Sequence, residues 1–351
     1  MDLKYIGRII DVFTLSETLF KNSRDLGFMS LHWEEMNHHK VLTTESLVNF
    51  RSNKQKKGGI SLGLDDNFNS WSGTLESWRS LIPEDYMIDR LPSIDVGNAG
   101  LTKYRAKYLD FNKLHHIYWL YLVKSSLTLT DDPSKIVCEI GGGYGSFVDL
   151  LLGKHRKALL IDLPLSNALS AYYLASLFPN KKLLLFDDYL TNKRKISYKD
   201  FEEHDIIILP PGCDYDRDLK IDLIVNARSF MEMTTQSIAY HFRFIQQHLK
   251  EGGLFLNINR YQKITSGEVI NFHNYPYDSR WQVLKSIPLE TQPHIHLLLT
   301  RRTSEYEEGN IRQALKLSKK IGSRYRVRIV KLIPQLLKIR LYKLKKYLLK
   351  K

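Results

Sequence analysis

The sequence predicts a doubly wound α/β fold with a mostly parallel sheet, and three observations support that prediction. Short, continuously apolar segments alternate with helical segments over residues 134–302. These apolar segments lack the alternation of a half-exposed strand, which indicates burial on both faces. A glycine-rich turn follows the first of them, as at the start of a strand–turn–helix unit. The expected strands are 135–140, 158–162, 183–186, 206–209, 221–226, 254–259 and 295–300, and the expected helices are 144–152, 166–178 and 235–249.

We expect three regions along the chain. Residues 1–130 are rich in aromatic side chains and mixed charge, and they should form a helical cap on the sheet. Within them, residues 101–129 are expected to be one helix, because apolar residues recur there at helical spacing. Residues 131–302 should form the α/β domain, and residues 303–351 a basic, amphipathic helical tail. One ambiguity remains inside the domain: segments 183–186 and 206–209 compete for one strand position, so either could be an extra or edge strand.

The positive charge of the chain comes from its last residues. The 351 residues include 52 Lys and Arg and 38 Asp and Glu, for a net charge of +14. Residues 311–351 hold fifteen of those Lys and Arg and no acid, which leaves 37 basic and 38 acidic residues in the rest. A neutral body argues against a nucleic-acid substrate, which usually requires a basic catalytic surface. We therefore expect no nucleic-acid partner.

The tail itself has the pattern of a docking segment. After Pro334, leucines at 337, 341, 344 and 348 share one helical face, and lysines and arginines fill the other positions. Such a helix can lie on an anionic membrane surface. Residues 324–329 alternate in a strand-like way, which differs from the period of one continuous helix. A protein partner, a nucleic acid or a solvated terminus are the alternatives.

Cysteine usage and hydropathy indicate a cytoplasmic protein. Cys138 and Cys213 are far apart and form neither a disulfide framework nor a metal-like cluster, which suits a reducing compartment. The first residues lack the pattern of a signal peptide, and no apolar segment approaches the length of a membrane-spanning helix. We expect no metal ion and a cytoplasmic location, with the tail as the segment that would touch the inner face of the membrane.

The most informative segment is Val-Cys-Glu-Ile-Gly-Gly-Gly-Tyr-Gly at 137–145. Its glycines let the backbone approach a ligand without a Cβ clash, and the helix start that follows offers free N–H groups to a negatively charged group. The dinucleotide pattern Gly-x-Gly-x-x-Gly is broken by Ser146. The pattern acid-x-Gly-x-Gly-x-Gly is instead complete, at Glu139, Gly141, Gly143 and Gly145. We interpret this loop as a nucleotide-cofactor site, against the alternative of a plain tight turn.

Acidic residues follow the next two expected strands. Asp162 ends the strand after the loop, where a carboxylate can accept hydrogen bonds from both hydroxyls of a ribose. The alternative for Asp162 is an acid near a helix N-terminus. Asp187 and Asp188 follow segment 183–186. One of them is a candidate adenine contact, with Asp187 our choice, and a solvated turn is the alternative.

Three further segments extend this pattern: Ile-Asp-Leu-Pro at 161–164, Asp-Leu-Ile-Val-Asn-Ala-Arg-Ser-Phe-Met-Glu-Met at 222–233, and Asn-Phe-His-Asn-Tyr-Pro at 271–276. With the glycine loop they resemble a family of sugar O-methyltransferases from bacterial surface-polysaccharide gene clusters, within the Rossmann-like class I S-adenosylmethionine-dependent methyltransferases. The resemblance covers about residues 65–300. It implies S-adenosyl-L-methionine as cofactor and a sugar or glycan hydroxyl as acceptor. It also implies that Glu139 serves the amino-acid end of the cofactor while the glycines make room for it.

Catalytic candidates must follow strands, because ligands of open α/β sheets bind beyond the carboxyl ends of the strands. Asn226, which we assign to the cofactor site, ends segment 221–226. Arg228 and Glu232 follow that segment. Arg228 could bind a substrate carboxylate or phosphate, and Glu232 and His273 are candidate bases. The alternatives are a structural Arg228–Glu232 ion pair and a solvent-facing His273.

Aromatic residues of the first region could stack on a sugar or pack the core; they are Trp71, Trp78, Trp119, Tyr104 and Tyr108.

The sequence thus predicts an S-adenosylmethionine-dependent O-methyltransferase acting on a sugar of a bacterial surface polysaccharide. Three alternatives stay open. They are methylation of another small hydroxylated metabolite, a nicotinamide-dependent sugar oxidoreductase, and a non-catalytic protein that keeps the cofactor pocket.

Overall fold

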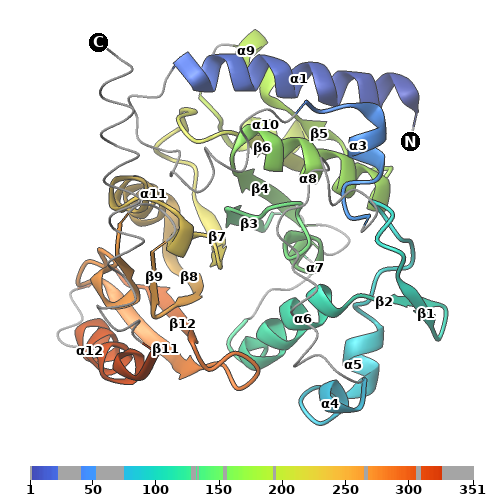
Figure 1. The fold of residues 1–351 in the computed structure, drawn as a ribbon. Helices are drawn as coiled ribbons and strands as arrows, with labels where there is room; N and C mark the ends of the chain where they lie inside the picture. The colour runs from blue at the N-terminus through green and yellow to red at the C-terminus, as the bar shows by residue number, and fades with distance from the viewer. Residues whose placement is uncertain are drawn as a thin grey trace, which may run out of the picture.

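The computed structural model describes residues 2–22, 41–52, 75–127, 132, 134–152, 156–192, 195–264, 268–305 and 310–325. Its centre is an eight-stranded sheet in the order β11-β12-β8-β7-β3-β4-β6-β5 (Figure 1). The strands are β3 (Ile136–Ile140), β4 (Lys157–Ile161), β5 (Leu183–Leu184), β6 (Ile206–Leu209), β7 (Ile221–Ala227), β8 (Leu249–Arg260), β11 (Trp281–Pro288) and β12 (Ile295–Arg302).

The sheet is mostly parallel, which confirms the predicted fold class. Strands β8, β7, β3, β4, β6 and β5 run parallel to one another, and β12 and β11 are antiparallel at one end. From β3 the chain goes to β4 and then to the edge strand β5, places β6 between those two, and returns to the other side of β3 for β7 and β8. The order therefore reverses between β3 and β7. In open α/β sheets, ligands bind beyond the carboxyl ends of the strands at such a reversal.

Helices cover both faces of the sheet. Figure 1 shows α6 (Phe111–Val123), α7 (Val148–Leu152) and α8 (Pro164–Leu177) on one side, and α11 (Thr235–His248) and α12 (Asn310–Gly322) on the other. Successive residues of β3 point into different layers: Val137 joins the core under α6–α8, and Cys138 the core under α11. Burial on both faces explains why the strands are apolar throughout.

The predicted strands 135–140, 158–162, 206–209, 221–226 and 295–300 match observed strands within two residues at each end. Both competing segments are strands, with β5 at the edge and β6 beside β4. β8 starts five residues earlier than expected. Sequence patterns did not predict β11, an edge strand whose residues are mostly half-buried, so its pattern is neither fully apolar nor cleanly alternating.

The first region contains α1 (Leu3–Asn22), α3 (Thr44–Val48), α4 (Leu75–Arg79), α5 (Glu84–Ile88) and α6. The prediction of one helix over 101–129 is wrong in its first third. Residues 102–109 form a hairpin of β1 (Thr102–Tyr104) and β2 (Lys107–Leu109), whose turn residues Arg105 and Ala106 have positive φ. The helix starts at α6 because the Asp110 carboxylate accepts hydrogen bonds from the N–H groups of Asn112 and Lys113.

Smaller elements complete the described fold: α9 (Phe186–Asn192), α10 (Tyr198–Glu203), β9 (Gln262–Lys263), β10 (Ile270–Asn271), and the 3₁₀ turns η4 (Phe230–Glu232), η5 (Phe272–Asn274) and η6 (Ser323–Tyr325). The start of the expected tail forms α12, which packs on β11 and η5 through Ile311 and Ala314. The predicted loop at 54–59, Trp71 and the leucine pattern after Pro334 lie outside the described residues. Within the described part, no helix is both long and apolar enough to cross a membrane.

Candidate active site

The glycine loop joins β3 to α7 at the carboxyl edge of the sheet. Gly141 has φ +71° and donates its N–H to the Ile161 carbonyl at 2.8 Å. A Cβ at Gly141 would lie 1.8 Å from Ser229 Oγ, so glycine is required for the close approach of the segment that follows β7. Gly143 also has a positive φ, +60°, but a Cβ there would have no atom within 4 Å. The loop is therefore packed on one side and open at Gly143.

Glu139 lies beneath this loop and holds it. Its side chain is buried, and Oε2 accepts a hydrogen bond from the Val148 N–H at 3.0 Å, at the start of α7. A Cβ at Gly142 would lie 2.8 Å from the same oxygen. Burial raises the pKa of Glu139 to about 8, although the Val148 bond opposes that shift. The carboxyl group of Glu139 therefore fixes the loop from within.

Asp162 connects the end of β4 to the open part of the loop. Its Oδ2 accepts from the Gly143 N–H at 2.8 Å, and its Oδ1 accepts from the Leu163 N–H at 2.7 Å. Burial raises the pKa of Asp162 to about 6, against the effect of these two bonds and of a hydrogen bond with the Ser166 side chain. A carboxylate has about four acceptor positions, so about one remains for a ligand hydroxyl. The side chain is half-buried and adjoins the open space at Gly143.

Asn226, assigned to the cofactor from sequence, is buried in a network that ties β7 to β3. Its Nδ2 donates to the Ile140 carbonyl at 2.8 Å, and its Oδ1 accepts from the Phe230 N–H at 3.1 Å. Asn259 of β8 donates to the same Oδ1 at 2.8 Å. These bonds occupy both ends of the amide. The structure thus places Asn226 as a positioning residue that joins the two sides of the strand-order reversal.

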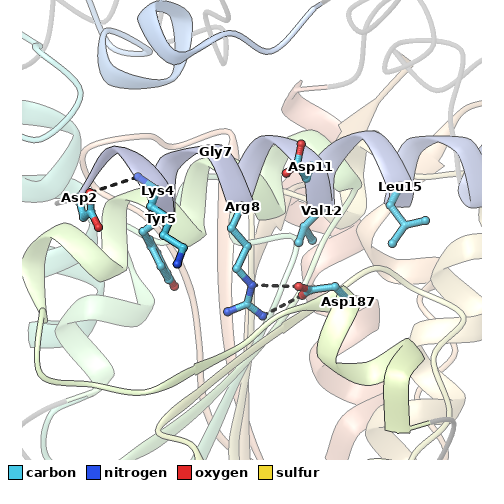
Figure 2. Close-up of a pocket in the computed structure, with 9 residues that line it drawn as sticks. All are labelled: Asp2, Lys4, Tyr5, Gly7, Arg8, Asp11, Val12, Leu15 and Asp187. Carbon is cyan, nitrogen blue, oxygen red and sulfur yellow. Dashed lines mark hydrogen bonds and ion pairs between the residues drawn. The ribbon is translucent and has the colours of Figure 1, made fainter.

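Asp187 lies at the start of α9 and is bound by the first helix. The Arg8 guanidinium donates to both of its carboxylate oxygens, at 2.9 and 3.0 Å, and to Asp188 Oδ2 at 2.6 Å. Figure 2 shows this pair in the wall of a pocket of about 640 Å³ along α1. The residues that line it are Asp2, Lys4, Tyr5, Gly7, Arg8, Asp11, Val12, Leu15 and Asp187. Asp187 is thus anchored to α1, and its contact with adenine stays a prediction.

Helix α6 anchors the far end of the glycine loop. Lys113 is buried, and its Nζ donates to the Ser146 carbonyl at 2.6 Å and pairs with Asp149 of α7. Arg51 pairs with Asp110 at 2.6 Å, and its guanidinium lies 5.1 Å from the centre of the Tyr144 ring. Sequence reasoning did not identify Lys113 or Arg51, because no local pattern connects them to the loop.

Basic residues gather at the carboxyl ends of β7 and β8. Arg228 follows β7 with φ +61°, and its N–H donates to the Ile258 carbonyl of β8 at 2.7 Å. Arg260 ends β8, and Lys263 of β9 pairs with Glu232 of η4. We call Arg228, Arg260 and Lys263 the cationic cluster. A positive φ in an arginine costs roughly 1–3 kcal/mol, and such strained residues occur both in tight turns and at functional sites.

Two histidines that sequence reasoning did not select adjoin the cationic cluster. His294 precedes β12, and its carbonyl accepts from the Tyr261 N–H at 3.1 Å. Burial, with the charges of Arg260 and Arg228, lowers the pKa of His294 to about 4. Burial and the charge of Arg228 lower the pKa of His115 on α6 to about 3. Both imidazoles are therefore neutral near pH 7, although the lowered pKa makes each a weaker base than an ordinary histidine.

The two bases selected from sequence occupy different surroundings. Glu232 lies in η4 beside the cationic cluster and pairs with Lys263, whereas His273 lies in η5, which packs against α12. Glu232 and His273 both remain predictions as bases.

Two of the tryptophans considered as sugar contacts, Trp78 and Trp119, are fully buried in the core, and the Tyr104 hydroxyl donates a hydrogen bond to Glu84 at 2.7 Å. Among the described residues, no group of three or more His, Cys, Asp or Glu could hold a metal ion.

No family model matches this chain, and no curated protein matches it significantly. Among solved structures, mitomycin 7-O-methyltransferase is similar at 13% identity over 55% of this chain and 57% of its own, with a TM-score of 0.34. Geranyl diphosphate methyltransferase in complex with SAM is similar at 13% identity over 55% and 87%, with a TM-score of 0.35. The glycopeptide N-methyltransferase MtfA is similar at 12% identity over 52% and 94%, with a TM-score of 0.30. The chain thus spans little more than half of the first of these proteins, and we assign the fold class from its own strand order.

Proposed function

We propose that this protein is an S-adenosylmethionine-dependent O-methyltransferase. The observation that carries the proposal is the open backbone at Gly143 beside Asp162, at the point where the strand order reverses. Asp162 has an acceptor position left for a ribose hydroxyl, and the bare main chain leaves room for the rest of a nucleoside. The side chains there therefore fit a nucleoside cofactor.

The cofactor would supply a methyl group that is already activated on a positively charged sulfur. The protein then has to orient an acceptor hydroxyl and take up its proton, and orientation can contribute several kcal/mol. Glu232 and His294 lie at the edge of the sheet where that hydroxyl would be placed. We assign proton removal to this group of residues, with His273 as the further candidate from the sequence.

For the acceptor, we propose a sugar of a bacterial surface polysaccharide, on the resemblance carried by segments 161–164, 222–233 and 271–276. We also propose that α12 and the tail bring the enzyme to an anionic membrane surface, where lipid-linked glycans lie. The exposed face of α12 carries Arg312, Lys316, Lys319 and Lys320 and no acid. A basic helix face adds about 1 kcal/mol of binding per residue near such a surface.

Calorimetric titration tests the cofactor proposal. We expect the purified chain to bind S-adenosylhomocysteine, the demethylated product, and not NADH. Binding of NADH with no heat from S-adenosylhomocysteine would support the oxidoreductase alternative and reject the proposal.

Mass spectrometry of the surface glycan from cells with and without this gene then tests the acceptor. A loss of one methyl group per repeat is expected, and an unchanged glycan would exclude this acceptor.

A further inference from the structure

The cationic cluster is partly buried and contains one cation whose donor is left unmet among the described residues. Arg228, Arg260 and Lys263 converge from β7, β8 and β9, and Glu232 is the carboxylate beside them. Burial lowers the pKa of each of the three cations, and the charge of Glu232 opposes that shift in each. Within the described residues, Glu232 pairs with Lys263 and not with Arg260, so Arg260 is the cation that remains for an anionic ligand. A partly buried cation is unfavourable unless an anion or a hydrogen-bond acceptor completes it.

Arg260 gives the second observation. In the part of the chain that the structure describes, its Nε is buried and has no hydrogen-bond partner. A buried donor without a partner costs about 1–3 kcal/mol. A guanidinium presents its N–H groups as a planar fork that matches the oxygens of a carboxylate or a phosphate. The unfilled position at Arg260 is therefore suited to an oxyanion.

The position of the cluster indicates which ligand brings that oxyanion. Arg260 and Lys263 extend from β8, and β8 is two strands away from β3, which bears the glycine loop. Neighbouring strands lie about 4.8 Å apart, so the end of β8 is about 10 Å from the cofactor loop across the sheet. Between them lies the segment after β7, where Ser229 packs on Gly141. The cluster thus faces the acceptor side of the site.

We propose that the acceptor is anionic and that Arg260 and Lys263, with Arg228 between them and the cofactor loop, bind its carboxylate or phosphoryl group. This inference rests on the proposed methyltransferase function, because it assigns the glycine loop to the cofactor. It narrows the acceptor to a uronic-acid sugar or a phosphate-linked sugar, and it excludes a neutral free sugar. The anion would anchor the acceptor about two strands away from the methyl donor.

Calorimetric titration of the full chain with S-adenosylhomocysteine present tests the inference, with glucuronate, inorganic pyrophosphate and glucose as probes. We expect one of the two anions to bind and glucose not to bind. The anion that binds identifies the carboxylate or the phosphoryl source. Arg260→Gln and Lys263→Gln should each weaken that binding at least fivefold, and the affinity for S-adenosylhomocysteine should change less than twofold. Arg301→Gln is the matched control, because Arg301 is exposed on β12 near its far end.

Glu232→Gln gives a result that misfolding cannot imitate. Removing the carboxylate that pairs with Lys263 should tighten binding of the same anion at least twofold. If neither anion binds to a protein that binds S-adenosylhomocysteine, the inference is overturned while the proposed function stands. It is also overturned if Arg260→Gln and Lys263→Gln mainly weaken S-adenosylhomocysteine, because the cluster then serves the cofactor carboxylate. A wild-type chain that does not bind S-adenosylhomocysteine contradicts the proposed function instead.

Discussion

Gly141 and Gly143 share a left-handed backbone for different reasons, and alanine substitutions should separate those reasons. Their φ angles are +71° and +60°. A Cβ at Gly141 would overlap Ser229, whereas one at Gly143 would enter open space beside Asp162. If that space receives the cofactor, Gly141→Ala should damage the fold and Gly143→Ala should damage binding. Gly100, at φ +68° and with no atom within 4 Å of its Cβ position, is the control outside the site.

The expected sizes follow from these surroundings. Alanine at positive φ costs about 1–2 kcal/mol, and its smaller unfolded-state entropy returns about 0.4–1 kcal/mol. Gly143→Ala and Gly100→Ala should therefore each lower the free energy of unfolding by about 1 kcal/mol or less. Gly141→Ala must also displace Ser229, and overpacking of this kind costs about 1–3 kcal/mol more. Its total loss should be about 1–4 kcal/mol.

Urea unfolding measures the stabilities, and calorimetric titration with S-adenosylhomocysteine measures binding. We expect Gly143→Ala to weaken binding at least tenfold at near-normal stability, and Gly100→Ala to bind as the wild type does. Equal stability losses at positions 141 and 143 would contradict the contact with Ser229. Full binding by Gly143→Ala would show that the open space is not the ligand site.

Two other predictions concern charge. Burial raises the pKa of Glu139 to about 8, whereas an unfolded glutamate has a pKa near 4.3. The free energy of unfolding of the wild type should therefore fall as the pH rises from about 4 to about 8, by at most about 1.4 kcal/mol per pH unit. Glu139→Gln should lack that loss, so its urea midpoint should rise relative to that of the wild type between pH 5 and pH 8. If the two midpoints change with pH in the same way, the raised pKa of Glu139 is refuted. Each lysine near an anionic membrane contributes about 1 kcal/mol of binding. Replacing Lys316, Lys319 and Lys320 of α12 by Gln should therefore lower the affinity for anionic vesicles, measured by cosedimentation, by about a hundredfold. Unchanged cosedimentation, or equal binding to neutral vesicles, would reject membrane docking by this helix.

The sheet could be predicted from the sequence because its strands are buried on both faces. Residues 206–209 form β6 without any change of bounds, since four consecutive isoleucine and leucine residues leave no other interpretation. Edge elements were missed or misassigned for the opposite reason. β11 and the β1–β2 hairpin are half-exposed, so their polar residues carry no clear period. The helical spacing of apolar residues over 101–129 led us to include the hairpin in the predicted helix. Asp110, a recognisable N-cap residue, marks where the helix begins.

The candidate site was predictable only where its residues are close in sequence. The glycine loop and Asp162 follow from local spacing. The contacts that position them do not, because they join residues far apart in the chain. Arg8 reaches Asp187 across 179 positions, and Asn226 reaches the Ile140 carbonyl across 86. The cationic cluster likewise assembles from three elements that share no motif, so only the fold brings Arg228, Arg260 and Lys263 together.

Hydrogen-bond satisfaction separates the residues that hold this site from those that face a ligand. Asn226 and Glu139 are buried, and protein groups occupy both ends of the Asn226 amide and one oxygen of Glu139. A buried polar group that the protein already satisfies gains little from a ligand, so the bonds of Asn226 fix the loops. Glu139 holds the glycine loop through one oxygen, and its contact with the cofactor stays a prediction. Gly143 and the Nε of Arg260 differ from these two residues. The Cβ position of Gly143 faces open space, and the buried Nε of Arg260 has no hydrogen-bond partner in the described part of the chain. Gly143 belongs to the loop that we propose as the cofactor site, and Arg260 lies two strands away, so under the proposed function the two would mark opposite ends of one bound complex.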